Sequence, residues 1–449
     1  MIFSRFASTK TRSSAFALAL ALATGTAMTA VAIEAPAEAQ RKKKKKEEAP
    51  KADYSKAFVE TYQPLNTQVA EGGDPATLKA GIPAVIAAIE TADDRMAAGS
   101  LIFSIGQKAN DPATQSQGVE MMLASGKVPA ANLAQYNFLA GQLAYNQNVF
   151  GKAREFVQAA FDLGYTQNDP QAIIAETYFA EDKHAEGLSY LDAAIKARQA
   201  AGQEVSQSWV QRGVAIAYNN QLVEQARAFS VLYASDFPSN SSWGDAIAIA
   251  LNTSQFEYPE ILDLLRLARR TGTMRDANMY MEYIEAADAR RNPSEVTNVI
   301  DEGYAAGLLD RGDSFVSDSR AQAAGRIAAD KADLPALGRD ARAASATLRT
   351  VMAAGDAYLS YDRGAEAEEF FAKALGMPGV NMPLALTRLG IAQLDQGKFA
   401  EAAATFGKVE GERETITNLY AAWADQQGAA QAAPATATPA APATEQVGG

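Results

Sequence analysis

The chain has 449 residues and a formal charge of −12 at neutral pH, and 48% of its residues are hydrophobic. It contains no cysteine and one histidine, which excludes disulfides, cysteine catalysis and a metal site built from several imidazoles. The acidic balance disfavours non-specific nucleic-acid binding, because that binding depends on neutralising phosphates. Alanine is abundant and alternating strand patterns are scarce, so the composition predicts an all-α fold.

Residues 1–39 have the pattern of a secretory signal peptide. Three basic residues precede an apolar run from about Ala15 to Ala23, and A-x-A cleavage sites end at Ala39 and, alternatively, at Ala32. The apolar run is short for a membrane span and is followed by polar residues. We therefore expect an exported protein of a Gram-negative-type bacterium, located in the periplasm, with no transmembrane segment after signal cleavage.

Both ends of the remaining chain are of low complexity. Residues 40–53 include the basic run Arg41–Lys46, which is either a solvated arm or a peripheral contact with an anionic envelope surface. Residues 428–449 form an Ala/Pro-rich tail that cannot bury enough apolar surface to fold. We expect both segments to be disordered.

Small residues recur in pairs at a fixed spacing along the chain. Two antiparallel helices pack closely where each has a small residue, and in the last unit Gly390 and Ala402 occupy these positions. Equivalent pairs lie upstream, with steps of 34, 35 or, after a longer loop, 39 residues: Gly141 and Ala153, Ala175 and Gly187, Val214 and Ala226, Gly355 and Ala367. The pattern predicts helical hairpins that must stack, because one hairpin alone cannot bury its apolar face.

This repeat resembles the tetratricopeptide repeat (TPR), a helix-turn-helix unit of about 34 residues. The chain departs from the family at the tryptophan of the fourth repeat position, where Asn137, Gln171, Val210 and Leu386 stand. The resemblance implies a right-handed α-α superhelix, with TPR-like repeats in residues 54–309 and TPR units with a capping helix in residues 349–427. Residues 310–348 fit the period poorly, so we expect an irregular helical connector there, interrupted at Leu334-Pro335.

The resemblance also implies a binding groove, since the first helix of each TPR unit lines the concave face. The positions that face a bound segment are held here by Phe138, Gln142, Tyr145, Asn146, Glu176, Phe179, Gln211, Tyr218 and Asn219. A Tyr-Asn pair occurs twice among them. Asparagine can bond both the N–H and the C=O of a peptide, and tyrosine adds rigid apolar area. These residues either bind an extended protein segment or contact neighbouring helices.

No catalytic motif accompanies the repeats. His184 takes a repeat position that Phe150 holds elsewhere, so we interpret it as a packing residue rather than a general base. The tripeptide Arg311-Gly312-Asp313 is ordinary turn chemistry, and Asp93-Asp94 is expected to be a solvated helix face. We expect a scaffold or adaptor for a protein or peptide partner, not an enzyme, with no cofactor. The alternatives are a structural protein docked on an acidic surface through its Lys run and, less favoured, a cell-wall-polymer enzyme framed by a superhelix.

Overall fold

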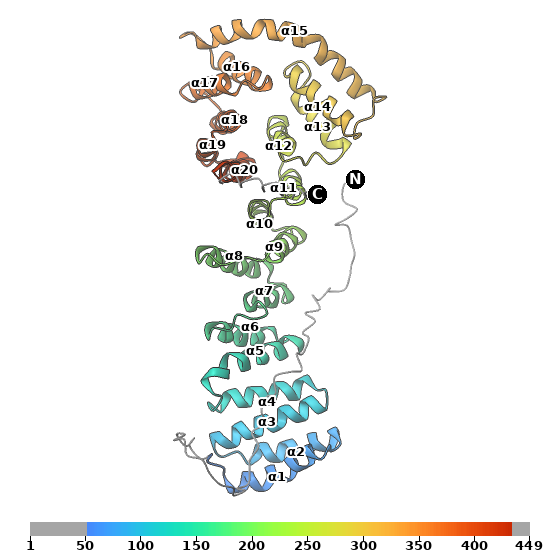
Figure 1. Ribbon diagram of the computed structural model, residues 1–449, viewed down its shortest axis with the longest axis vertical. Coiled ribbons are helices and arrows are strands. Elements are labelled where there is room, and N and C mark those ends of the chain that lie inside the picture. The colour runs from blue at the N-terminus through green and yellow to red at the C-terminus, as the bar shows by residue number, and fades with distance from the viewer. Residues whose placement is uncertain (1–51, 433–449) are drawn as a thin grey trace, which may run out of the picture. The chain divides into compact units, whose positions relative to one another are not determined.

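A computed structural model describes residues 52–432 of the protein. Within these residues every regular element is helical, with 20 α-helices and one short 3-10 helix (Figure 1). The chain divides into two compact units, residues 1–182 and residues 183–449. In each unit, consecutive helices pack on one another through short connections. The described chain is therefore an all-α, TPR-like array, which confirms the predicted fold class.

The first unit is a series of packed helices, three of which begin at a proline. Its described part contains α1 (Lys56–Ala70), α2 (Pro75–Ala87), α3 (Ala92–Lys108), α4 (Pro112–Ala124), α5 (Ala130–Asn146), α6 (Phe150–Asp162) and α7 (Pro170–Ala180). Pro75 and Pro112 begin their helices, where a missing N–H costs no hydrogen bond. The backbones of α3 and α4 touch, since a Cβ on Gly118 would lie 2.4 Å from the backbone nitrogen of Phe103.

The second unit continues the helix pairs and contains one helix of unusual length. Its described helices are α8 (His184–Ala200), α9 (Gln207–Asn219), α10 (Val223–Asp236), α11 (Asn240–Thr253), α12 (Tyr258–Arg270), α13 (Ala277–Ala287), α14 (Pro293–Ala305), α15 (Ser314–Arg342), α16 (Leu348–Ser360), α17 (Gly364–Leu375), α18 (Met382–Asp395), α19 (Phe399–Phe406), η1 (Gly411–Arg413) and α20 (Glu414–Ala432). None of the helices within residues 52–432 combines the length and apolar character that a bilayer span requires.

One backbone turn recurs between paired helices. A residue with left-handed φ, between 48° and 74°, follows the first helix at Asn110, Asn148, Gln221, Asp362 and Gly397. The N–H of the next residue donates to a carbonyl five positions earlier, as from Val149 to Ala144 and from Lys398 to Gln393. The second helix then begins two residues after the left-handed residue. The repeat is therefore a repeat of local geometry as well as of sequence.

The contact between paired helices also recurs. A glycine in the first helix faces a large residue 16 positions later, in the pairs Gly141 and Val157, Gly213 and Phe229, Gly355 and Phe371, Gly390 and Phe406. A Cβ on any of these glycines would lie only 2.3 to 2.6 Å from that neighbour. The assignment of Val214 to this position is wrong, because Gly213 makes the contact. In this unit the contact lies one residue earlier relative to the turn.

Residues 310–348 differ from the expected irregular connector. Most of this stretch is the single helix α15, which runs for 29 residues and continues through Pro335. Proline removes one backbone hydrogen bond, but the residues around it are anchored: Leu334 is buried, and its carbonyl accepts a hydrogen bond from Tyr358 at 3.0 Å. Packing on α16 therefore outweighs the local break that Leu334-Pro335 predicts.

The ends of the described chain are more ordered than the sequence predicts. The N–H of Asp53 donates to Asp93 at 2.9 Å, so the last residue of the expected disordered arm is held against α3. At the other end, α20 continues to Ala432, beyond the expected start of the tail at residue 428. The predicted signal peptide of residues 1–39, the basic run Arg41–Lys46 and residues 433–449 lie outside the described residues.

Substitution of Gly390 tests the repeated helix contact. Gly390→Ala should lower the free energy of unfolding of the second unit by about 1–3 kcal/mol, because Phe406 is buried and cannot yield to the added methyl group. Urea unfolding followed by tryptophan fluorescence reports this unit alone, since all three tryptophans of the chain lie in it. Gly325→Ala in α15 is the matched control, with nothing within 4 Å of the new methyl group. It should be neutral or stabilise by up to about 1 kcal/mol, and equal losses in the two variants would contradict the contact.

Candidate functional site

Six of the nine predicted groove residues lie in the first unit, four of them on α5. In order along α5 these are Phe138, Gln142, Tyr145 and Asn146. Phe138 is 3% exposed and stacks on Tyr165 with ring centroids 4.3 Å apart, so its side chain belongs to the core. Tyr145 is half-buried and lies edge-on to Phe150 at 5.4 Å. Gln142 is half-buried and Asn146 is exposed, so the surface of α5 here is polar and uncharged.

The other predicted groove residues lie on α7 and α9. On α7, Glu176 is half-buried and Phe179 is buried. On α9, in the second unit, Tyr218 is half-buried and Asn219 is exposed. Gln211 is exposed, and its amide donates to the hydroxyl of Tyr233 at 2.6 Å. The predicted residues thus form two sets, one on α5 and α7 and one on α9.

Asp263 is the centre of a buried group of charges that the sequence analysis missed. Its side chain is fully buried on α12 and contacts three arginines: Arg266 at 3.0 Å, Arg413 at 2.7 Å and Arg388 at 3.6 Å. The hydroxyl of Tyr420 also donates to the backbone carbonyl of Asp263 at 2.7 Å. This one residue therefore joins α12 to α18, to η1 and to α20.

Arg266 extends the charged group to the next helix pair. Its guanidinium donates two hydrogen bonds to Glu295 on α14, both at 2.7 Å, and Tyr283 on α13 donates to the same carboxylate at 2.6 Å. Arg266, Tyr283 and Glu295 are all buried. Because a buried charge is tolerated only when it is paired and hydrogen-bonded, α12, α13 and α14 must take this arrangement together.

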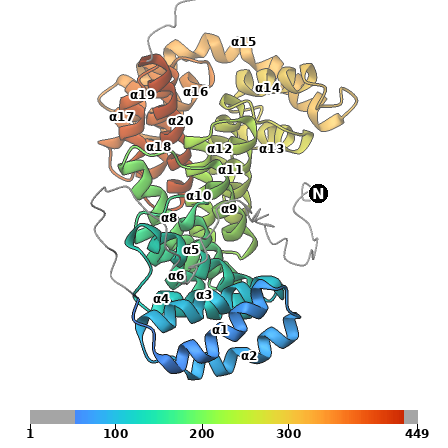
Figure 2. The same ribbon diagram turned by 60° about the horizontal axis from the view of Figure 1, so that its bottom comes forward.

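Further contacts close the second unit on itself. Arg270, at the end of α12, donates to both oxygens of Asp395, at the end of α18, at 2.7 and 2.9 Å. Gln426 of α20 donates to the carbonyls of Ala234 and Ser235 at 2.7 and 3.0 Å. Helix α20 packs on α10, α11 and α12 as well as on α19 (Figure 2). The expected capping helix thus covers earlier helices of its own unit.

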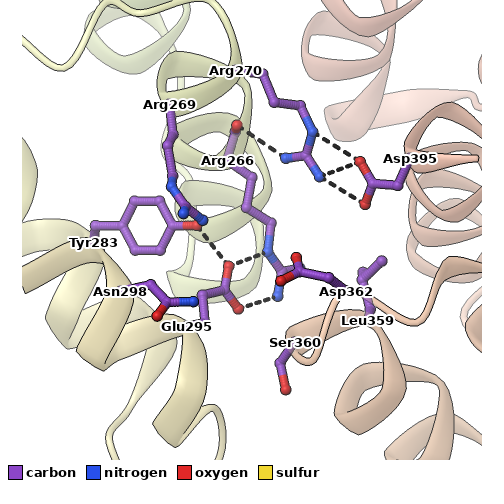
Figure 3. A pocket seen from close by; sticks show the side chains of 10 residues that line it. All are labelled: Arg266, Arg269, Arg270, Tyr283, Glu295, Asn298, Leu359, Ser360, Asp362 and Asp395. Atoms are coloured by element: carbon purple, nitrogen blue, oxygen red, sulfur yellow. Dashed lines mark hydrogen bonds and ion pairs between the residues drawn. The ribbon is translucent and has the colours of Figure 1, made fainter. Parts of the chain in front are cut away.

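A half-open cavity of about 280 Å³ lies among these helices (Figure 3). It is lined by Arg266, Arg269, Arg270, Tyr283, Glu295, Asn298, Leu359, Ser360, Asp362 and Asp395. Each of the three arginines forms two or more hydrogen bonds with one carboxylate of the chain: Arg266 with Glu295, Arg269 with Glu302, and Arg270 with Asp395. Because these guanidinium groups are already paired, the cavity is not a preformed anion site.

Residues that line this cavity stand at the same positions relative to the recurring turn as the predicted groove residues do. Tyr145 and Asn146 stand three and two residues before the turn residue Asn148, and Tyr218 and Asn219 stand at the same distances before Gln221. In the last two units the equivalent residues are Leu359 and Ser360 before Asp362, and Leu394 and Asp395 before Gly397. Three of these four, Leu359, Ser360 and Asp395, line the cavity. In the second unit, residues equivalent to the predicted groove positions therefore line this cavity together with arginines of α12.

The pKa values of the buried carboxyl groups reflect their arginine partners. Burial alone would raise the pKa of Asp263, but Arg388, Arg413 and Arg266 outweigh it and hold this pKa below the ordinary 3.8. Burial would also raise the pKa of Glu295, but Arg266 outweighs this effect and holds the pKa below the ordinary 4.5. Burial and the charge of Glu295 raise the pKa of Tyr283 well above 10.0. The carboxylates are therefore ionised and the tyrosine is neutral at neutral pH.

The other sequence candidates have structural roles. Asp94 is fully buried and caps α3: its carboxylate accepts from the N–H of Thr91 at 3.0 Å, and its own N–H donates to the Thr91 hydroxyl. The interpretation of Asp93-Asp94 as a solvated face is therefore wrong for Asp94, because a helix N-terminus has free N–H groups to offer. Asp313 accepts from the N–H of Val316 and begins α15. Within residues 52–432, no cluster of His, Asp or Glu is arranged to hold a metal ion.

Comparisons with known proteins find weak likenesses among solved structures. No family model matches the chain, and no curated protein matches it. Similar solved structures include the TPR2AB domain of yeast Sti1 in complex with pHSP90 (TM-score 0.22, 14% identity, 67% of this chain and 98% of that chain). The TPR domain of P58(IPK) (0.22, 11%, 84% and 100%) and the APC/C hetero-tetramer Cut9-Hcn1 (0.19, 12%, 84% and 88%) are also similar. These TM-scores are too low to show a shared overall shape, and the fold class rests on the repeated helix pairs.

Matched glutamate substitutions test the buried network. Glu295→Gln should lower the free energy of unfolding of the second unit by about 3–5 kcal/mol, because it leaves Arg266 buried without a full counter-charge. Glu369→Gln is the control, since Glu369 accepts the same type of two-bond pair from Arg342 at the exposed surface. The control should cost less than about 1 kcal/mol. Urea unfolding by tryptophan fluorescence measures both, and similar losses would contradict a special role for burial.

The same network predicts how the second unit responds to acid. Asp263 faces Arg266, Arg388 and Arg413, and its folded pKa is lowered, as is that of Glu295. A lowered folded pKa contributes stability above the ordinary pKa and loses it as the pH falls. The urea midpoint of tryptophan fluorescence should therefore decline from about pH 4.5 downward, and Asp263→Asn should flatten this decline. A midpoint that stays constant or rises down to about pH 2.5 would show that the two carboxylates are not ionised in the fold.

Proposed function

We propose that the protein is a scaffold or adaptor that binds a protein or peptide segment through the first helices of its repeats. The observation that carries the proposal is the common turn, which gives successive units the same local frame. In that frame a Tyr-Asn pair recurs three and two residues before the turn, as Tyr145-Asn146 and Tyr218-Asn219. Both asparagines are exposed. An amide side chain beside a tyrosine suits hydrogen bonding to an extended backbone.

We propose that the protein binds its partner and catalyses no reaction itself. The strongest concentration of titratable groups, around Asp263, has each carboxylate committed to arginine partners. These carboxylates are ionised and hold the fold, so they have no proton to donate, and their lowered pKa values make them weak bases. The TPR structures similar to this chain include one in complex with pHSP90, which is a property of that protein. For this chain we propose a partner of the same general kind, a protein segment.

The proposal also places the protein in the periplasm, soluble or peripherally attached to the envelope. Its support is the signal pattern of residues 1–39 alone. An envelope contact through the basic run Arg41–Lys46 remains part of the proposal on charge grounds. A partner would then be an envelope protein or an exported peptide.

Paired substitutions test the proposed binding positions separately in the two units. Tyr145→Ala with Asn146→Ala, and Tyr218→Ala with Asn219→Ala, should each reduce capture of partners several-fold, because each removes a side-chain amide and an aromatic contact. Capture is measured by crosslinking in intact cells and by pull-down from envelope extract. Lys152→Ala on the second helix α6 is the control and should leave capture unchanged. Full capture by both double variants, with circular dichroism unaltered, would rule out these positions.

A further inference from the structure

Two charged groups that line the half-open cavity keep unused hydrogen-bonding capacity. Asp362, in the turn after α16, is exposed, and its carboxylate forms no hydrogen bond or ion pair with any residue between 52 and 432. The side chain of Arg269 is 33% exposed and binds Glu302 through Nε and Nη2. The two N–H groups of its Nη1 have no acceptor in the described chain. One cavity therefore holds an open group of each charge.

Neutral groups of the lining can take further hydrogen bonds. Ser360 is 6% exposed, and its hydroxyl donates to the carbonyl of Ala357 at 2.9 Å. The buried hydroxyl of Tyr283 donates to Glu295 at 2.6 Å. Since each hydrogen is committed, the oxygen of each hydroxyl can only accept. Asn298, exposed on α14, adds an amide that can both donate and accept. The lining can therefore satisfy a ligand that carries donors and acceptors.

The two sides of the cavity differ in charge. Figure 3 shows the arginines of α12 on one side, and Ser360, Asp362 and Asp395 on the other. Each arginine already has a carboxylate partner, so Asp362 is the charge of the lining that lacks one. A simple anion would add a second unbalanced negative charge, and a simple cation would leave Nη1 of Arg269 without an acceptor. A zwitterion satisfies both sides, because its ammonium and carboxylate groups can bind opposite walls and its own charges cancel.

The size of the cavity limits the ligand to a small molecule. Its volume is about 280 Å³. Liquid water occupies about 30 Å³ per molecule, so this space corresponds to roughly nine non-hydrogen atoms. A free amino acid is of this size, whereas a helix or an extended protein segment is not. Because the cavity is half-open, such a ligand can enter while the buried pairs of Asp263 stay in place.

We propose that this cavity binds a free amino acid as its zwitterion. The ammonium group lies at Asp362, and the carboxylate accepts hydrogen bonds from Nη1 of Arg269 and from the amide of Asn298. Because α12, α14 and the turn after α16 all contact the ligand, its binding stabilises the second unit and makes that stability depend on the amino acid concentration. The site is separate from Tyr145 and Tyr218, and the inference does not rest on the proposed function.

Urea unfolding of the full-length protein, followed by tryptophan fluorescence, tests for binding. Glycine, alanine, serine, threonine, valine, leucine, asparagine and glutamine are added singly at about 10 mM, and at least one should raise the urea midpoint, because a ligand of the folded state stabilises it. No rise with any of them would overturn the proposal. A rise that Asp362→Asn shows to the same extent would also overturn it, since it would reflect only a general solvent effect.

Matched analogues of the amino acid that raises the midpoint most test for a zwitterion. The same molecule without its amino group, and the same molecule without its carboxylate, should each bind at least about tenfold more weakly, because each lacks one charged hydrogen-bonding group. Calorimetry with the native protein measures the three affinities. Equal binding of the amine would show a cation site, and equal binding of the acid would show an anion site. Either result would overturn the proposal.

Asp362→Asn tests the ammonium end of the site and should weaken binding of the amino acid at least about tenfold. The turn tolerates this change, because asparagine adopts left-handed φ readily and Asn148 holds the equivalent turn. Asp182→Asn is the matched control, since Asp182 also has a φ of 58° but does not line the cavity. The control should keep the native affinity. Native affinity in Asp362→Asn would overturn the proposal.

Arg269→Gln tests the carboxylate end of the site. The variant leaves Glu302 at a position where its side chain is 45% exposed, so the fold tolerates the loss of the pair. Its affinity for the amino acid should fall about tenfold, whereas its affinity for the analogue without a carboxylate should stay unchanged. Equal losses for the two ligands would overturn the assignment of the carboxylate to Arg269.

Discussion

The second unit depends on the burial of one carboxylate, that of Asp263, among three arginines. A buried charge is strongly unfavourable without partners, so α12, α18 and η1 must be in place together. The paired network need not add net stability, because desolvation of the charged groups offsets much of their attraction. Its effect is to exclude other arrangements, since any shift of α18 or η1 would leave an arginine buried alone. The buried charges thus select the arrangement of these helices, and apolar side chains form the core between them.

The same repeat geometry presents a different side chain two residues before the turn in different units. Two residues before the turn, Asn146 and Asn219 are neutral, whereas Asp395 is charged and draws Arg270 of α12 toward it. A neutral amide suits a peptide backbone, and a carboxylate suits an arginine. The hairpin therefore supplies the frame, and the residue at this position sets the charge that the frame presents there.

The parts of the fold that depend on near neighbours in sequence could be predicted. Helix starts at proline and the tight contacts of Gly390 and Gly355 follow from local chemistry and from the repeat. The network around Asp263 could not be predicted, because Arg413 is 150 residues away in the chain. Its one local signal is the spacing of Asp263 and Arg266 among leucines, which places charges on an otherwise apolar helix face. That spacing indicates a buried pair but not the partners that complete it.

The stretch where the repeat fails is a single long helix instead of a hairpin. Helix α15 stands alone between two helix pairs, packing on α14 before it and α16 after it (Figure 1). At 1.5 Å per residue, its 29 residues span roughly 43 Å. A regular array would place a hairpin here and continue in one direction. After this single long helix, residues of α16 and α18 line one cavity with residues of α12. The poor fit of residues 310–348 to the repeat thus marks the place where one helix stands instead of a hairpin, and Pro335 is tolerated because α15 packs on α14 and α16.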